Sequence, residues 1–403
     1  MKLHRNLCIA VITALKDILL EKKQADLCVE HLLQSNKSWG ARDRHFIAGN
    51  IYHIIRYKRL YEFCCDEETW GESSLWRVFG TKLILEEVDL PGWTEFEELD
   101  KAKIIERSIE AKGIRKIRES IPDWLDQLGE KALGANWDKE IAALNTQAKF
   151  SIRVNTLKSN KNVIKILFTE EGIEFSETEM APDALVINSR KNLRNLPAYK
   201  NGLFEVQDIS SQLVAPLLEA KPGMNVIDGC AGAGGKTLHI GALMQNAGEI
   251  LAVDVNERKL EELKKRADRA GCSIIVEMES AKLTSHFQAR LNSFADRILL
   301  DVPCSGLGVL RRKPDAKWTL TKLFIEELKK TQAEILDEYA LMLKPEGIMV
   351  YSTCSILPEE NELQVRSFIE RNNNRFVLLT ERRISPSETG FDGFYMAQIK
   401  RLI

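Results

Sequence analysis

The chain has 403 residues, 44% of them hydrophobic and 29% charged, and a formal net charge of −2. It is too long for one ordinary core and too apolar to be disordered, so two or three domains are expected. The charge is uneven, because residues 1–65 carry eleven Lys or Arg against six Asp or Glu, whereas residues 66–100 carry two against eleven. Any nucleic-acid surface must therefore be a local patch.

The cysteines and the start of the chain bear on the cellular compartment. Eight cysteines occur without a CxxC pair or regular spacing, so we expect neither a metal site nor a disulfide framework, and a reducing compartment fits best. Basic residues precede the apolar run LCIAVITAL (7–15), as in a secretory signal, but no small-residue cleavage site follows. No uncharged stretch approaches the roughly 20 residues that span a bilayer. We expect a cytoplasmic monomer without membrane contact.

The first part of the chain has helical periodicity. Apolar residues recur at three- and four-residue steps to about residue 120, as in Ile9, Ile12, Leu15 and Leu19, which predicts a helical domain. Short apolar runs at 150–154 and 184–187 then surround a helical stretch near 163–171, which predicts a small α+β domain. We place the helical domain at 1–139, the α+β domain at 140–206 and a third domain at 207–403.

The third domain alternates buried-strand runs with helical stretches. Such alternation implies crossover connections and a mainly parallel sheet with helices on both faces. The predicted fold class is α/β, a doubly wound Rossmann-like domain of seven strands. The strands are predicted at 224–230, 249–255, 273–278, 296–302, 347–354, 375–379 and 395–399.

The first of these strands runs into the glycine-rich segment DGCAGAGGKT (228–237). Glycines there let the backbone approach a ligand where the next helix begins. A phosphate-binding loop would need glycine at position 230, where Cys230 stands, and the dinucleotide fingerprint GxGxxG would need glycine in place of Thr237. A methyltransferase arrangement remains, with Asp228 ending the first strand and Asp254 ending the second. Alternatively, the glycines only allow tight packing and Asp254 caps the helix that begins at Asn256.

Two cysteines stand where neighbouring strands are predicted to end. Cys304 follows the fourth strand and Cys354 follows the fifth. Ligands of doubly wound sheets bind beyond the carboxyl ends of the strands, so both cysteines can face one pocket. A single cysteine there is more often buried filler. A pair beside a cofactor loop favours chemistry instead, because a thiolate added at carbon 6 of cytosine makes carbon 5 nucleophilic enough to accept a methyl group.

A basic segment with an aromatic residue follows Cys304 directly. Cations that meet phosphates and a ring that can stack on a base suit looped or single-stranded RNA. Such a charge run is otherwise an ordinary solvated surface. The predicted RNA contacts are Arg311, Arg312, Lys313, Lys317 and Trp318.

Several segments form a pattern that extends over nearly the whole chain. The most specific part is PCSG followed by RRKPDAKW, and then TCS-x-x-PEEN. Further segments are RVNTLK (153–158), FEVQDISSQLV (204–214), DGCAGAGGKT, and FDGFYMA (391–397). By these segments the chain resembles the Sun-type (RsmB) family of RNA cytosine-5 methyltransferases, and its N-terminal part, including GARDRHFIAGNIYHIIR (40–56), is similar to NusB.

The resemblance implies roles for individual residues. Cys354 would be the nucleophile, Cys304 would assist product release, and Asp301 would contact the base. The methyl donor would be S-adenosylmethionine and the substrate small-subunit ribosomal RNA. The cofactor contacts implied by the family are Cys230, Ala231, Gly232, Ala233, Gly234, Gly235, Lys236, Asp254 and Asp301.

The chain departs from the family pattern at two places. The usual loop CAAPGGK has Gly232 and Ala233 in place of Ala-Pro, which removes a rigid proline and weakens the expected grip on the cofactor. The acidic residue that the family has after the third strand, for contact with the adenine, is not clearly matched. Glu279 and Ser280 align with it about equally well. The altered loop is also the one feature that favours a second hypothesis, a non-catalytic RNA-binding or ribosome-assembly protein that retains the methyltransferase fold.

Overall fold

A computed structural model describes residues 3–67, 71–189, 191–280, 289–372 and 375–403. The chain forms two compact units, Met1–Thr146 with Leu310–Thr321, and Gln147–Val309 with Lys322–Ile403. Residues 310–321 thus belong with the helical unit, although they lie within the segment that we assigned to the third domain. The borders at 139/140 and 206/207 stay predictions.

The first unit is helical in the residues described, which confirms the predicted helical N-terminal region; its likeness to NusB stays a prediction. No helix in the described part of the chain combines the length and the apolar character needed to cross a membrane. The helices of this unit are α1 (Arg5–Leu15), α2 (Ala25–Ser35), α3 (Ala41–Cys65), α4 (Glu72–Leu85), α5 (Lys101–Ala111), α6 (Arg115–Arg118), α7 (Asp123–Leu133), α8 (Trp137–Leu144) and α16 (Ala316–Thr319).

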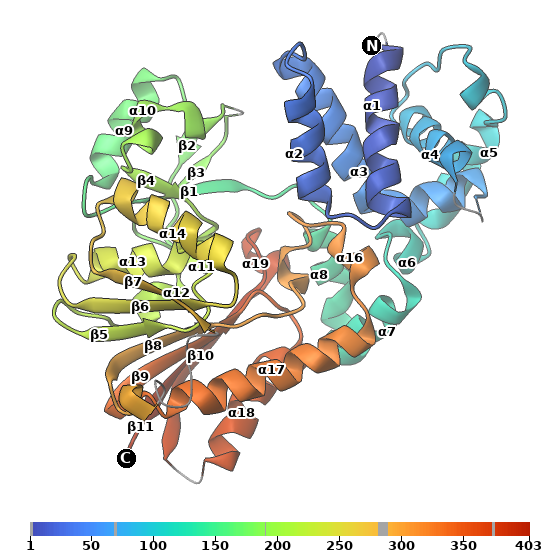
Figure 1. Cartoon of the computed structure of the whole chain (residues 1–403). Coiled ribbons are helices and arrows are strands. Elements are labelled where there is room, and N and C mark those ends of the chain that lie inside the picture. Colours follow the sequence, from blue (N-terminus) through green and yellow to red (C-terminus); the bar gives the residue numbers. More distant parts are fainter. Residues whose placement is uncertain (1–2, 68–70, 190, 281–288, 373–374) are drawn as a thin grey trace. The chain divides into compact units, whose positions relative to one another are not determined.

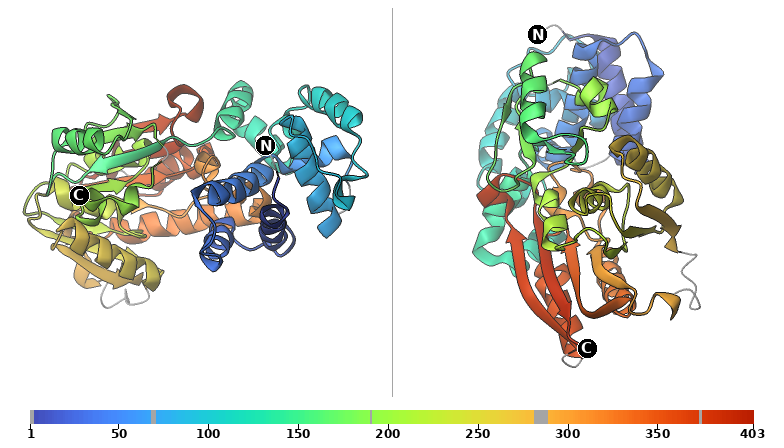
Figure 2. Two further views of the ribbon diagram at one scale, coloured as in Figure 1. Left: turned by 90° about the horizontal axis from the view of Figure 1, so that it is seen from above. Right: turned by 90° about the vertical axis from the view of Figure 1, so that its left-hand side faces the viewer.

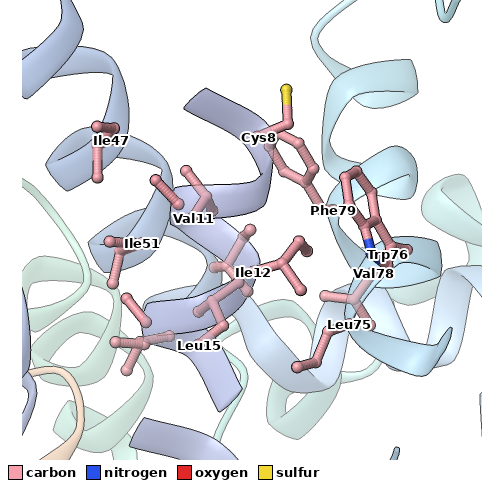
Figure 3. Packing of buried hydrophobic residues seen from close by; sticks show 14 of the residues in the cluster. Cys8, Val11, Ile12, Leu15, Ile47, Ile51, Leu75, Trp76, Val78 and Phe79 are labelled. Atoms are coloured by element: carbon pink, nitrogen blue, oxygen red, sulfur yellow. The ribbon is translucent and has the colours of Figure 1, made fainter. Parts of the chain in front are cut away.

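Apolar side chains of α1, α3 and α4 form the core of this unit (Figure 3). On α1 the buried residues include Val11, Ile12 and Leu15, whereas Ile9, which we included in the apolar stripe, is 48% exposed. The helical period predicted for α1 is therefore present, but the buried face of the helix is centred about one residue away from the predicted apolar positions. On α3, Ile47 is buried in the same core.

The second unit contains a small antiparallel sheet. Its strand order is β2-β3-β1-β4, and α9 (Lys161–Glu170) contributes Ile164 and Phe168 to the core beside it. This arrangement confirms the predicted α+β segment. Its strands are β1 (Phe150–Val154), β2 (Phe175–Ser176), β3 (Ala184–Ile187) and β4 (Phe204–Val206), and α10 (Pro197–Lys200) precedes the last of them.

A seven-stranded sheet forms the rest of this unit, with the order β10-β11-β9-β8-β5-β6-β7. The pairs among β5 to β9 are parallel, whereas β11 is antiparallel to both of its neighbours. The red strands of Figure 2 show β10 beside β11. The strands are β5 (Asn225–Asp228), β6 (Glu249–Asp254), β7 (Ile275–Glu279), β8 (Ala295–Asp301), β9 (Leu343–Thr353), β10 (Phe376–Ile384) and β11 (Phe394–Arg401).

Alternate residues of the central strands enter different cores, so helices cover both faces of the sheet (Figure 1). Val226 packs with helix α13, whereas the next residue, Ile227, packs with helix α17. The doubly wound α/β prediction is therefore confirmed. The helices of this part are α11 (Ile209–Gln212), α12 (Val214–Leu217), α13 (Gly235–Leu243), α14 (Glu257–Ala270), α17 (Lys322–Ala340), α18 (Glu362–Arg371) and α19 (Pro386–Thr389).

Candidate active site

The glycine-rich segment forms the turn between β5 and α13. Gly232 and Gly234 have φ of 55° and 84°, in the left-handed region that glycine tolerates best. A Cβ on Gly234 would also lie 2.6 Å from Leu263 Cγ, whereas one on Gly232 would meet no atom within 4 Å. Gly234 therefore serves the packing of the turn, and Gly232 lies beside open space.

The loop without proline is held by a side-chain contact from α14. Arg266 donates a hydrogen bond of 2.6 Å from Nη1 to the carbonyl of Ala233, and Nη2 lies 2.9 Å from Glu205 Oε2. Arg269 contacts the other oxygen of Glu205 at 2.5 Å. These charge-assisted bonds restrain the backbone at the position where the family pattern has its proline.

Asp254, at the end of β6, holds two backbone groups. Its carboxylate accepts hydrogen bonds from the N–H of Gly232 at 2.8 Å and from the N–H of Asn256 at 2.9 Å. The alternative that Asp254 caps α14 is thus partly right, because Asp254 binds the N–H of Asn256. The side chain that caps the helix itself belongs to Asn256. A carboxylate has about four acceptor positions, so both oxygens retain capacity for a ligand.

Asp228 lies beneath this loop and is 1% exposed. Burial raises the pKa of Asp228 to about 7. The hydrogen bond that Thr237 Oγ1 donates to its carboxylate acts in the opposite direction and lowers the pKa. The folded protein therefore binds an additional proton between the ordinary pKa of 3.8 and about 7, and its stability falls as pH rises through this window.

We expect Asp228→Asn to remove this contribution, because an amide does not titrate. Urea unfolding midpoints measured at about pH 5 and about pH 8 check the sign: the wild type should lose more stability over this interval than the variant does. An equal loss in both proteins would contradict the assignment to Asp228.

A cavity of about 780 Å³ opens beside the glycine-rich turn. Its volume lies in the range of small-molecule sites. Ser280 lines it together with Val255, and Glu279 is not among the residues that form its wall. Every cofactor contact implied by the family except Gly234 lines this cavity, namely Cys230, Ala231, Gly232, Ala233, Gly235, Lys236, Asp254 and Asp301.

Asp301 stands at the end of β8 with both oxygens engaged. Lys236 Nζ lies 2.5 Å from Oδ2, and Ser352 Oγ donates a hydrogen bond of 3.0 Å to Oδ1. The Lys236 ammonium also lies 5.0 Å from the centre of the Phe394 ring. These contacts fix the direction of the Asp301 carboxylate at the cavity wall.

The structure brings the two cysteines together. Asp301 and Ser352 are register partners in the parallel pair β8–β9, so the turns that follow leave the sheet side by side. Cys304 Sγ and Cys354 Sγ are 3.2 Å apart. The hydrogen bond with Cys354 and burial raise the pKa of Cys304 well above its ordinary value. Cys304 therefore remains a protonated thiol that can donate a hydrogen bond to the sulfur of Cys354.

Two of the predicted RNA contacts are buried in the structure. Lys317 is 1% exposed, and its ammonium donates hydrogen bonds to the carbonyls of Arg56 and Glu119 and to Asn145 Oδ1. Burial lowers its pKa well below the ordinary value. Arg311 is 3% exposed and donates to the carbonyl of Ala143.

Trp318, which is half-buried, donates from Nε1 to the carbonyl of Ile55 at 2.7 Å. The backbone of α3 is non-helical at Tyr57, and the inserted side chains of Lys317 and Trp318 bind carbonyls next to this kink. The segment thus stabilises the helical unit. Lys313 is exposed, Arg312 and Trp318 are half-buried, and these three stay candidates for RNA contact.

We expect Lys317→Ala to reduce the free energy of unfolding by about 2–4 kcal/mol, because it removes a buried donor that binds three acceptors. Lys313→Ala, on the exposed side of the same segment, should change it by about 0.5 kcal/mol or less. Urea unfolding of the two variants measures the difference. A Lys317→Ala protein of wild-type stability with weakened RNA binding would restore the original prediction.

Comparisons with known proteins agree with this geometry. Residues 215–400 match the family model of the 16S rRNA methyltransferase RsmB/F, and residues 121–194 match the ferredoxin-like domain of the same proteins. Proteins called ribosomal RNA small subunit methyltransferase B from Photorhabdus laumondii and Vibrio cholerae are each 34% identical to the chain. The matches cover 70% of this chain and 66% and 65% of those relatives, which is slightly less than two thirds of their length.

Solved structures show the same fold. A protein called PH0851 superposes over 100% of both chains with a TM-score of 0.83 and 24% identity. A methyltransferase homolog from Pyrococcus horikoshii has a TM-score of 0.63 and 28% identity, and covers 72% of this chain and 98% of its own. These structures show the fold, whereas the two family models and the 34% identical relatives show that the chain belongs to the RsmB/F methyltransferase family.

Proposed function

We propose that the protein transfers a methyl group from S-adenosylmethionine to carbon 5 of a cytosine in RNA, through a covalent thiolate adduct at carbon 6. The observation that carries the proposal is the pair of sulfurs 3.2 Å apart at adjacent strand ends. Pro303, next to Cys304, lines the same cavity as the glycine-rich turn. A reactive thiol pair thus stands beside a nucleoside-sized cavity.

The residues of that cavity fit the cofactor. The open space at Gly232 admits a ligand against the backbone, and the remaining acceptor positions of Asp254 suit the two ribose hydroxyls. Ser280, which lines the cavity, is proposed to meet the adenine in preference to Glu279, which does not line it. S-adenosylmethionine held there supplies an electrophilic methyl group on a sulfonium.

Cys354 is assigned as the nucleophile. Its thiolate forms a bond to carbon 6 of the cytosine, and the electrons of the 5,6 double bond make carbon 5 able to accept the methyl group. Loss of the carbon-5 proton then restores the double bond as the carbon–sulfur bond breaks and the thiolate leaves. Asp301, oriented by Lys236 and Ser352, is placed to contact the polar edge of the base.

Cys304 is assigned to product release. Its sulfur lies 3.2 Å from the Cys354 sulfur, within hydrogen-bond distance. A donor at this position stabilises the departing thiolate by a hydrogen bond. The raised pKa of Cys304 supports this role, because the group stays protonated while Cys354 reacts.

The proposed substrate is small-subunit ribosomal RNA. The 34% identical relatives carry that substrate in their names. Exposed Lys313 and half-buried Arg312 are proposed to meet its phosphates.

Incubation with labelled S-adenosylmethionine and undermethylated ribosomal RNA tests the proposal, with 5-methylcytosine as the expected labelled product. Absence of label, under conditions where cofactor binding is demonstrated, would favour the non-catalytic RNA-binding alternative.

A further inference from the structure

One buried carboxylate contacts both turns that carry the cysteines. Glu360 ends the short 3₁₀ helix Pro358–Glu360 and is 0% exposed. Its Oε2 accepts hydrogen bonds of 2.5 Å from Ser305 Oγ and from Ser355 Oγ. Its Oε1 accepts a hydrogen bond of 2.7 Å from the backbone N–H of Ser305. Ser305 and Ser355 directly follow Cys304 and Cys354.

A third element meets the same carboxylate. Gln332 of α17 donates from Nε2 to Glu360 Oε1 at 3.1 Å and to the carbonyl of Pro303 at 2.9 Å. The backbone of Glu360 is held as well, because Tyr351 donates a hydrogen bond of 2.6 Å from its hydroxyl to the Glu360 carbonyl. The carboxylate therefore joins α17, the Cys304 turn and the Cys354 turn at one point.

The partners of Glu360 named above are neutral donors. Burying a carboxylate is costly unless hydrogen bonds replace its hydration, and four of them do so here. An ordinary turn needs only one short polar side chain to close it. A carboxylate adds two oxygens in a fixed plane, which lets one side chain bridge two separate turns.

We propose that Glu360 is a positioning residue that sets the distance between the Cys304 and Cys354 sulfurs. This inference rests on the proposed function of the two cysteines. The distance matters because both sulfurs must serve the same cytosine, and a displacement of about 1 Å can cost about 100-fold in rate. The negative charge of Glu360 also helps to keep Cys304 protonated.

The test compares three variants of the full chain. Glu360→Ala removes the bridge. Glu360→Gln keeps its shape, because the amide oxygen can still accept from the Ser305 N–H and Gln332, while the two serine hydroxyls turn to accept from the amide NH₂. Glu359→Gln is the matched control, because the adjacent Glu359 is half-exposed and pairs with Lys329 at 2.8 Å instead.

Two quantities are measured for each variant: kcat and KM for methyl transfer, and the rate at which diamide forms a Cys304–Cys354 disulfide, followed by peptide mass spectrometry. In that reaction the two thiols lose two electrons and two protons to diamide as the sulfur–sulfur bond forms. We expect Glu360→Ala to lower kcat about 100-fold with little change in KM and to slow disulfide formation. Glu360→Gln should recover most of both, and Glu359→Gln should match the wild type.

Disulfide formation at the wild-type rate in Glu360→Ala would overturn the inference, whatever the methylation rate. Failure of the glutamine variant to recover either quantity would overturn it too, because the shape of the bridge would then not matter. If Glu360→Ala does not fold, Glu360→Asp, whose carboxylate is one methylene shorter, replaces it. The disulfide assay needs no RNA, so it still tests Glu360 if the wild type shows no methyl transfer.

Discussion

Replacing Cys354 with alanine is expected to abolish methyl transfer, with a fall in kcat of about 10⁵-fold or more, the scale seen when an enzyme loses its nucleophile. The reason is chemical: without a thiolate at carbon 6, carbon 5 of cytosine does not attack a methyl sulfonium. Binding of S-adenosylmethionine should persist, because Cys354 does not line the cofactor cavity. Label transfer and cofactor titration on the same preparation measure the two effects.

Cys28→Ala is a suitable control for this experiment. Cys28 is half-buried on α2 and belongs to the other compact unit. Its replacement removes one thiol without touching the proposed site, so full activity is expected. Substantial methyl transfer by Cys354→Ala would contradict the assignment of the nucleophile.

The second large effect is expected from Cys304→Ala, which should accumulate a covalent protein–RNA adduct that survives denaturation. Its sulfur lies 3.2 Å from the Cys354 sulfur and is the proposed proton donor, so its loss should slow departure of the thiolate more than attack. A denaturing gel with labelled RNA detects the adduct as a species of reduced mobility.

The same gel distinguishes the roles of Cys354 and Cys304. Cys354→Ala and the double variant should show no retarded band, because neither can form the carbon–sulfur bond. A stable adduct in Cys354→Ala and none in Cys304→Ala would exchange the two roles.

The sheet could be predicted from the sequence because its central strands, such as β6 and β9, are largely buried and therefore appear as continuous apolar runs. All seven strands were found, and their ends were the less accurate part. β10 continues to Ile384, whereas the predicted strand ends at residue 379. The prediction ended early because the last part of the strand carries exposed charged residues such as Arg382. Charged residues are common on an edge strand, and an apolar pattern does not detect them.

The burial of Arg311 and Lys317 within the segment 311–318 could not be predicted from the sequence, because it depends on tertiary structure. Its composition favours a nucleic-acid surface, yet Lys317 and Trp318 bind carbonyls beside the α3 kink at Tyr57, more than 250 positions earlier in the chain. Nothing local in the sequence marks a cation that will be buried. Only the long-range packing distinguishes Lys317 from exposed Lys313.

The two cysteines were found from strand-end position, whereas Glu360 was not singled out. Both Glu359 and Glu360 stand in the motif PEEN, and their spacing from Cys354 differs by one residue. The fold separates them, since Glu359 pairs with Lys329 and Glu360 is enclosed by donors from two cysteine turns. Strand-end position therefore identified the two cysteines, and burial identified Glu360 as the residue that joins their turns.

The proposed mechanism depends on a covalent bond between Cys354 and the target cytosine. Peptide mapping of the adduct accumulated by Cys304→Ala, after digestion of the RNA and the protein, tests this bond. The peptide containing Cys354 is expected to carry the mass of a methylated cytidine nucleotide. A nucleotide attached to any other cysteine, or RNA methylated with no attached intermediate, would contradict it.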